Sequence, residues 1–232
     1  MSETRAQRER QLLETLSTLE VDVVGIVPVS GIADSRLHDQ VLGLLPGAKS
    51  VVALATEIYP EILDHSFPLK EMGEASPRDM LVPHMDYLNN RLTKSTYDLS
   101  RTIRRQGLKA LPMPAANYPT DQRFLFSVLS YKHAAEAAGL GSIGWHSLVM
   151  SAQFGPRLRL ACVLTEAEFP PGSQAGDSLC DGCGQCIKAC PAHALQEPNK
   201  GEAYSINKFA CSVFRAGAGP CSECMRVCPI GR

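Results

Sequence analysis

The sequence lacks the features that would direct a protein into a membrane, into an export pathway or onto a polyanion. No run of about 18 apolar residues is present, so no segment is long enough to cross a bilayer as a helix. Residues 1–20 are polar and contain neither an apolar signal core nor a twin-arginine pair. The net charge is −1, which gives no reason to expect nucleic acid or an anionic membrane as a partner. We therefore expect a cytoplasmic protein that binds neither.

Tryptophan is also scarce, with a single copy at Trp145, whereas cysteine is abundant. Eight of the nine cysteines lie between Cys180 and Cys228. Their spacing is Cys180-x2-Cys183-x2-Cys186-x3-Cys190-Pro191, then Cys211, then Cys221-x2-Cys224-x3-Cys228-Pro229. The ninth, Cys162, lies in the apolar run 158–164 and is predicted to be a buried core residue.

This cysteine spacing predicts two 4Fe–4S clusters. A C-x2-C-x2-C turn brings three thiolates to one cubane, and the cysteine before proline binds the other cluster of a two-cluster domain. Cluster 1 would then be bound by Cys180, Cys183, Cys186 and Cys228, and cluster 2 by Cys190, Cys211, Cys221 and Cys224. A zinc site explains the spacing less well, because zinc takes four ligands from two paired hooks. A disulfide framework explains it least well, and thiols bound to iron indicate a reducing compartment.

The residues before the cysteines alternate β-branched apolar runs with amphipathic stretches. Strands are predicted at 21–29, 50–56, 108–114 and 158–165, and helices at 83–106 and 127–138. Residues 57–82 are expected to be irregular, as a loop over a pocket or a solvated connector. The pattern predicts an α/β (α+β) domain with a mixed sheet over residues 1–170, followed by a cluster domain over residues 171–232.

A glycine-rich turn, Gly139-x-Gly141-x-x-Gly144, follows the second of these helices. A dinucleotide-binding fingerprint follows a strand and opens a helix, whereas here a helix comes before the glycines and a strand after them. The glycines therefore allow close approach of the backbone to a cofactor or to a neighbouring strand, and both explanations stay open. The candidate cofactor-binding residues of this turn are Gly141, Gly144, Trp145, His146 and Ser147.

Three further motifs join the cysteine pattern. They are Ala138-Gly-Leu-Gly-x-Ile-Gly, Phe154-Gly-Pro-Arg-x-Arg159 and Val163-Leu-Thr165. Together the motifs resemble the epoxyqueuosine reductase and reductive dehalogenase superfamily, clearly over residues 127–230 and more weakly upstream. The resemblance implies a nitroreductase-like α/β core that holds base-off cobalamin, followed by a bacterial-ferredoxin-like domain with two clusters. FMN is an alternative cofactor, because nitroreductase-like cores also hold it.

The resemblance also implies a route for electrons. A reduced ferredoxin- or flavodoxin-like donor would reduce the outer cluster, which would pass electrons to the inner cluster and then to the cofactor. The reaction would be the reduction of a small molecule. The alternative is an electron-transfer protein that serves a partner enzyme or a corrinoid protein and has no substrate of its own.

The chain departs from the family pattern in three ways. The tRNA-modifying members continue into a helical-repeat region, whereas this chain ends at Arg232, so tRNA is not expected as a substrate. Their catalytic aspartate would fall near residues 125–126, where no acid stands. The family's Gly-Lys-(His or Asn)-Thr pattern is Gly144-Trp-His-Ser here, so its lysine is missing. The candidate proton donors that remain are Tyr118, Asp121 and Tyr131, each of which also fits a structural or solvated role.

Overall fold

The core of the molecule is a four-stranded antiparallel sheet. The computed structural model describes residues 5–66, 76–170, 172 and 176–232. The strands lie in the order β1 (Val23–Pro28), β2 (Ser50–Glu57), β8 (Leu158–Thr165) and β3 (Ala110–Met113). The two central strands pair over their whole length, from Ser50 opposite Thr165 to Glu57 opposite Leu158.

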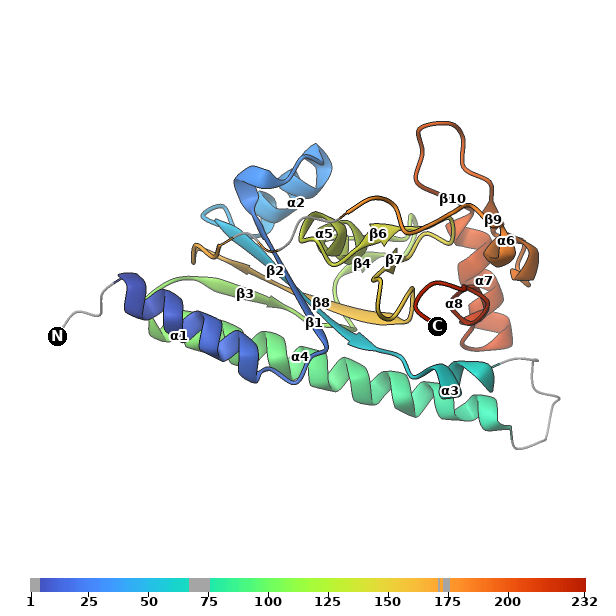
Figure 1. Ribbon diagram of the computed structural model, residues 1–232, viewed down its shortest axis with the longest axis horizontal. Coiled ribbons are helices and arrows are strands. Elements are labelled where there is room, and N and C mark those ends of the chain that lie inside the picture. Colours follow the sequence, from blue (N-terminus) through green and yellow to red (C-terminus); the bar gives the residue numbers. More distant parts are fainter. Residues whose placement is uncertain (1–4, 67–75, 171, 173–175) are drawn as a thin grey trace.

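Helices cover both faces of this sheet (Figure 1). Alternate residues of a strand point to opposite faces. On β2, Val52 and Leu54 pack with α1 (Arg5–Thr18) and α4 (Leu81–Arg105). Val51 and Ala53 pack on the other face, with α2 (Ser35–Leu44) and α5 (Tyr131–Ala137). The middle of each central strand, residues 51–55 and 160–164, is therefore continuously apolar, because both faces of the sheet are buried there.

The cysteine-rich segment forms a smaller region beyond one end of the sheet (Figure 1). Its elements are α6 (Gln185–Ala189), β9 (Leu195–Gln196), β10 (Ser205–Ile206), α7 (Lys208–Ala218) and α8 (Glu223–Arg226). The remaining short elements are η1 (Val29–Gly31), α3 (Pro60–Asp64), η2 (Pro77–Met80), β4 (Thr120–Asp121), β5 (Phe126–Ser127), β6 (Ser142–Ile143) and β7 (Val149–Met150).

Two buried arginines hold the cysteine-rich segment against the sheet domain. Arg157 donates a hydrogen bond from Nη2 to the carbonyl oxygen of Gly231 (2.6 Å) and forms an ion pair with Glu57 (3.2 Å). Arg78 donates from Nη2 to the carbonyl oxygen of Pro220 (3.0 Å). Buried guanidinium groups need such acceptors, because an unpaired buried charge is strongly unfavourable. Both ends of the segment that carries Cys221, Cys224 and Cys228 are thus fixed to the core.

The α/β class is confirmed, and so are the strand over 158–165 and the long helix that begins near residue 83. The expectation of a mixed sheet is wrong, because all three pairings among its described strands are antiparallel. Residues 57–82 are not wholly irregular either, since α3 and η2 lie within them. The domain boundary near residue 170 stays a prediction. None of the described helices is both long and apolar enough to cross a membrane.

Candidate iron–sulfur site

The structure brings the eight clustered cysteines together in two groups of four. Burial raises the pKa of the Cys186 thiol, at the start of α6, to about 11. Three other thiols lie close enough for their charges to raise this pKa further, namely Cys180, Cys183 and Cys228. The first turn of cysteines and the end of the chain therefore meet, although more than 30 residues separate them in sequence.

The second group is centred on α8. Burial raises the pKa of Cys224, and the charges of neighbouring thiols add to the rise, in the order Cys221, Cys211, Cys190 and Cys186. Burial also raises the pKa of Cys211 on α7, with contributions from Cys190 and Cys221. Because Cys186 of the first group acts on Cys224 of the second, the two groups are neighbours.

The composition and spacing of these groups fit iron–sulfur clusters. All nine cysteines are free thiols, so they do not form a disulfide framework. Each group holds four thiols, which is the donor set that a 4Fe–4S cluster takes.

A small cavity of about 20 Å³ connects the first cysteine group with the glycine-rich turn. Its lining includes Cys180, Cys183, Cys186 and Cys228 on one side and Trp145, His146 and Met150 on the other. The cysteine loop is tied to this turn by a hydrogen bond from the Leu179 N–H to Ser142 Oγ (2.8 Å). The candidate cofactor-binding turn thus lies directly against the predicted ligands of cluster 1.

Close packing accounts for two glycines of this turn. A Cβ on Gly141, whose φ is +154°, would lie 1.7 Å from the carbonyl oxygen of Met150 on β7. A Cβ on Gly144 would lie 2.9 Å from Met150 Cε and 3.0 Å from the His146 ring. Protein atoms fill the space in front of both glycines, so these positions do not form a cradle for a corrin or a flavin. Their predicted role in binding a cofactor stays a prediction.

Trp145 also packs on protein. A Cβ on Gly182, whose φ is +74°, would lie 2.9 Å from the indole ring. Gly182 stands between Cys180 and Cys183, so the ring lies against the backbone of the first cysteine turn. The indole ring of Trp145 is therefore in contact with protein, and its predicted role in binding a cofactor stays a prediction. The ring shields one side of that turn from solvent.

His146 is almost fully buried, with 4% of its surface exposed. Its Nδ1 accepts a hydrogen bond from the Leu148 N–H (3.1 Å). Nε2 is buried as well and has no hydrogen-bond partner among the described atoms. Burial lowers the pKa of this histidine to about 4, so the imidazole is neutral at physiological pH.

Lys132 on α5 is the residue of this site that sequence reasoning missed. Its Nζ donates hydrogen bonds to Ser147 Oγ (2.6 Å) and to the Ser147 carbonyl oxygen (3.2 Å) and lies 3.8 Å from the Tyr204 ring centroid. Burial lowers the pKa of this lysine to about 8. The turn that has Trp145 in place of the family's lysine therefore receives an ammonium group from another element. No local signal marks Lys132, because it stands 15 residues before Ser147.

The three candidate proton donors are engaged in local contacts. The Tyr131 hydroxyl donates to the Pro114 carbonyl oxygen (2.7 Å), and burial raises its pKa. The ring of Tyr118 lies 4.6 Å from that of Tyr131. The Asp121 carboxylate accepts two hydrogen bonds from the guanidinium of Arg123, which lowers its pKa. A catalytic role for these residues stays a prediction.

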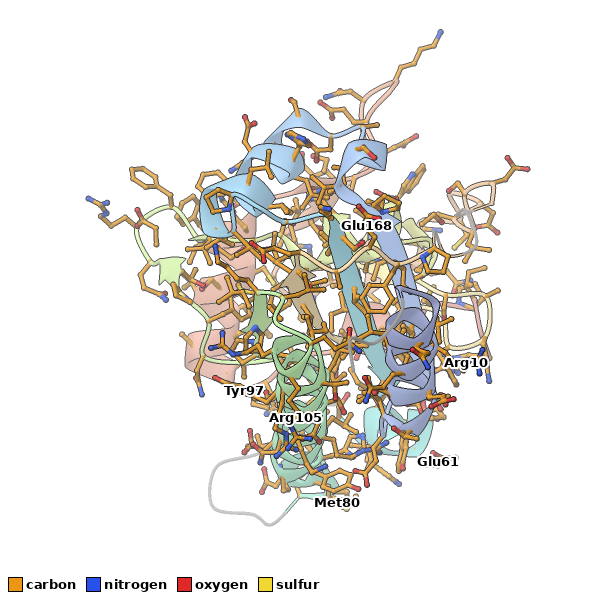
Figure 2. All side chains as sticks on the ribbon, turned by 90° about the vertical axis from the view of Figure 1, so that its left-hand side faces the viewer. Arg10, Glu61, Met80, Tyr97, Arg105 and Glu168 are labelled. Atoms are coloured by element: carbon orange, nitrogen blue, oxygen red, sulfur yellow. The ribbon has the colours of Figure 1, made fainter. Side chains whose placement is uncertain are left out.

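Two cavities that are larger than the one beside the glycine-rich turn lie away from the cysteines. One, of about 700 Å³, lies between β1, α2 and β2, and its lining includes Glu168. The other, of about 480 Å³, runs along α4 beside Tyr97 and Arg105. Figure 2 views the molecule from the end opposite the cysteine-rich region and labels these three side chains. Cys162 is also remote from solvent, with 0% exposure on β8, which confirms it as a core residue.

The fold and the thiol groups define an iron–sulfur protein, and comparison with known proteins agrees. Residues 177–196 match the family described as the 4Fe-4S binding domain. An epoxyqueuosine reductase of Bacillus cereus is 29% identical over 211 residues, covering 84% of this chain and 51% of the relative. That of a Synechococcus species is 32% identical over 207 residues, covering 80% and 56%. A tetrachloroethene reductive dehalogenase of Desulfitobacterium hafniense is 33% identical over 114 residues, covering 40% and 21%.

Solved structures of both kinds share the fold. A catabolic reductive dehalogenase gives a TM-score of 0.73 at 17% identity, covering 99% of this chain and 33% of that protein. A selenomethionine-labelled epoxyqueuosine reductase gives 0.59 at 19% identity, covering 98% and 66%. The chain is therefore similar in sequence to the epoxyqueuosine reductases and the reductive dehalogenases, and it shares its fold with solved structures of both. It spans between about a fifth and just over half of the length of these curated relatives.

Proposed function

We propose that the chain is an iron–sulfur reductase that uses two 4Fe–4S clusters to deliver electrons to a bound cofactor, cobalamin, for the reduction of a small molecule. Cluster 1 takes Cys180, Cys183, Cys186 and Cys228, and cluster 2 takes Cys190, Cys211, Cys221 and Cys224. The observation that carries the proposal is the cavity between the first cysteine group and the glycine-rich turn. It places the proposed ligands of cluster 1 directly beside Trp145, His146 and Met150.

The choice of cobalamin rests on the similarity to the epoxyqueuosine reductases and the reductive dehalogenases. The glycines of the turn, Gly141 and Gly144, are packed against protein atoms and do not open a cradle for it. This chain's own residues cover the first cysteine turn and hold the glycine-rich turn in place. Trp145 covers the backbone of the first cysteine turn, and Lys132 holds Ser147 in place with two hydrogen bonds.

The proposal predicts that the protein, once reconstituted with its iron–sulfur clusters, binds cob(II)alamin in the base-off form. The chain is purified anaerobically, reconstituted with iron and sulfide and titrated with cob(II)alamin, with the free cofactor in the same buffer as the control. A shift of the EPR spectrum to the base-off form supports the proposal. Binding of FMN in a parallel titration, without binding of cobalamin, would replace cobalamin by a flavin.

An electron-transfer protein without its own substrate is the second candidate. It is favoured by the contacts of the candidate proton donors, since the Tyr131 hydroxyl and the Asp121 carboxylate are both occupied by partners within the protein. A protein that only relays electrons needs no proton donor. Failure to bind either cobalamin or FMN, with both clusters intact, would select this function.

We propose further that the electron donor is a small acidic ferredoxin- or flavodoxin-like protein that docks on α7. This helix carries Cys211, and none of its residues is fully buried. Val213 is 73% exposed and Phe209 is 48% exposed. Two cations flank these apolar side chains, Lys208 and Arg215. An exposed apolar surface with positive charge at its edge suits a negatively charged partner.

Reversing the charge of Lys208 is expected to slow reduction by such a donor. The variant Lys208→Glu should lower the rate of cluster reduction by roughly threefold to tenfold at low salt, because charges at the edge of an interface act mainly on the association rate. The difference should shrink near 1 M salt, where the Debye length is about 3 Å. Stopped-flow reduction by flavodoxin measures this rate.

The matched control is Lys200→Glu, which makes the same change of charge in the loop between β9 and β10. This control should keep a rate close to that of the wild type. Equal slowing of both variants would point to net charge alone and contradict docking on α7.

A further inference from the structure

One nitrogen of His146, Nε2, is buried in the site without a hydrogen-bond partner among the described atoms. A neutral imidazole has one nitrogen that accepts and one that carries a proton. Since Nδ1 accepts from the Leu148 N–H, the proton is on Nε2. Nε2 is therefore a donor that is buried without an acceptor among the described atoms. Buried donors are almost always paired, so an acceptor belongs at this position.

The surroundings of His146 indicate what that acceptor is. The ring lines the cavity that Cys180, Cys183, Cys186 and Cys228 also line. Asp181 is the one carboxylate of that lining, and its Oδ1 already accepts from the Cys183 N–H (3.0 Å). Cluster 1 would bring bridging sulfides and thiolate sulfurs to this cavity, all of which accept hydrogen bonds.

We infer that His146 donates a hydrogen bond from Nε2 to a sulfur of cluster 1 and thereby raises the reduction potential of that cluster. A hydrogen bond to sulfur stabilises the reduced cluster more than the oxidised one, because the reduced cluster carries one more negative charge. Hydrogen bonds to the sulfurs are among the factors that set the potentials of such clusters. His146 is thus a tuning residue that acts through the cluster. The inference rests on the proposed ligands of cluster 1.

The test is an anaerobic redox titration, followed by EPR, of the reconstituted full chain and two variants. His146→Phe keeps a ring but removes the donor. It should retain about eight iron atoms. At the midpoint potential of cluster 1 in the wild type, the ratio of reduced to oxidised cluster 1 in this variant should be at least threefold lower. The potential of cluster 2 should not move. His146→Gln places an amide N–H near the position of Nε2 and should recover at least half of the shift.

A second measurement uses the wild-type protein alone, so that it does not depend on the folding of a variant. Protein labelled with 15N-histidine should show a 15N hyperfine coupling to reduced cluster 1 in pulsed EPR. Unchanged potentials together with the absence of this coupling, in protein that holds about eight iron atoms, would overturn the inference and leave the proposed function standing. If the wild-type protein holds no 4Fe–4S cluster at all, the proposed function itself is contradicted.

Discussion

Replacing Cys211 with alanine is expected to halve the iron content of the reconstituted protein, from about eight to about four atoms per chain. Cys211 is the proposed ligand that stands apart in the sequence, and α7 places it in the group that contains Cys190 and Cys221. A cubane takes four ligands, and the substitution leaves only three thiols in this group, those of Cys190, Cys221 and Cys224. Iron and acid-labile sulfide assays, normalised to protein concentration, measure the loss.

Cys162→Ala is the matched control, because it removes the same thiol group from a different environment. Cys162 is 0% exposed and lies opposite Ala53 and Met113 in the sheet. This variant should keep about eight iron atoms, although the lost packing lowers the free energy of unfolding by about 1 kcal/mol. Full iron content in Cys211→Ala would mean that the proposed ligand set is incorrect, and loss of iron in Cys162→Ala would mean that iron loading only reports on the fold.

Local spacing explains why so much of the cysteine site could be predicted. The runs 180–190 and 221–228 each hold their thiols within a few residues, so the turn itself brings them together. The same holds for the long helix α4, where periodic apolar side chains such as Leu92 and Leu99 mark the face that is buried. In both cases the information lies within one segment of chain.

Features that depend on distant segments could not be predicted. The glycine spacing indicated that something approaches the backbone closely at Gly141. It did not indicate that this neighbour is the carbonyl oxygen of Met150. The absence of lysine from residues 144–147 indicated a lost charge, whereas Lys132 reaches Ser147 from α5. The antiparallel pairing of the sheet likewise depends on which strands lie next to each other. The strand propensity of a segment does not contain that information.

The sheet domain also determines where the last proposed ligand of cluster 1 lies. Cys228 precedes the final residues of the chain, and these are fixed by contacts with the core. Arg157 binds the carbonyl oxygen of Gly231, and the backbone at Gly155 lies against the same residues. The cluster site is therefore completed only when the end of the chain docks on the loop before β8, so docking and cluster binding should be coupled.

Substituting alanine for Gly155 should disrupt this docking. Gly155 has a φ of +54°, and a Cβ there would lie 1.9 Å from the carbonyl oxygen of Ile230. The left-handed conformation and the overpacking together should cost about 2–4 kcal/mol, which corresponds to a decrease in Tm of roughly 4–16 °C for a chain of this size. Because Cys228 is two residues from Ile230, the EPR signal of cluster 1 should weaken more than that of cluster 2.

Gly43→Ala makes the same chemical change where nothing opposes it. Gly43 lies in α2, and no atom lies within 4 Å of a Cβ built on it. Alanine there should raise the free energy of unfolding by up to about 1 kcal/mol, through its higher helix propensity, and leave both clusters unchanged. If Gly155→Ala instead melts like the wild type and keeps cluster 1, the end of the chain does not depend on this contact. The fourth ligand would then be positioned by α8 and Arg157 alone.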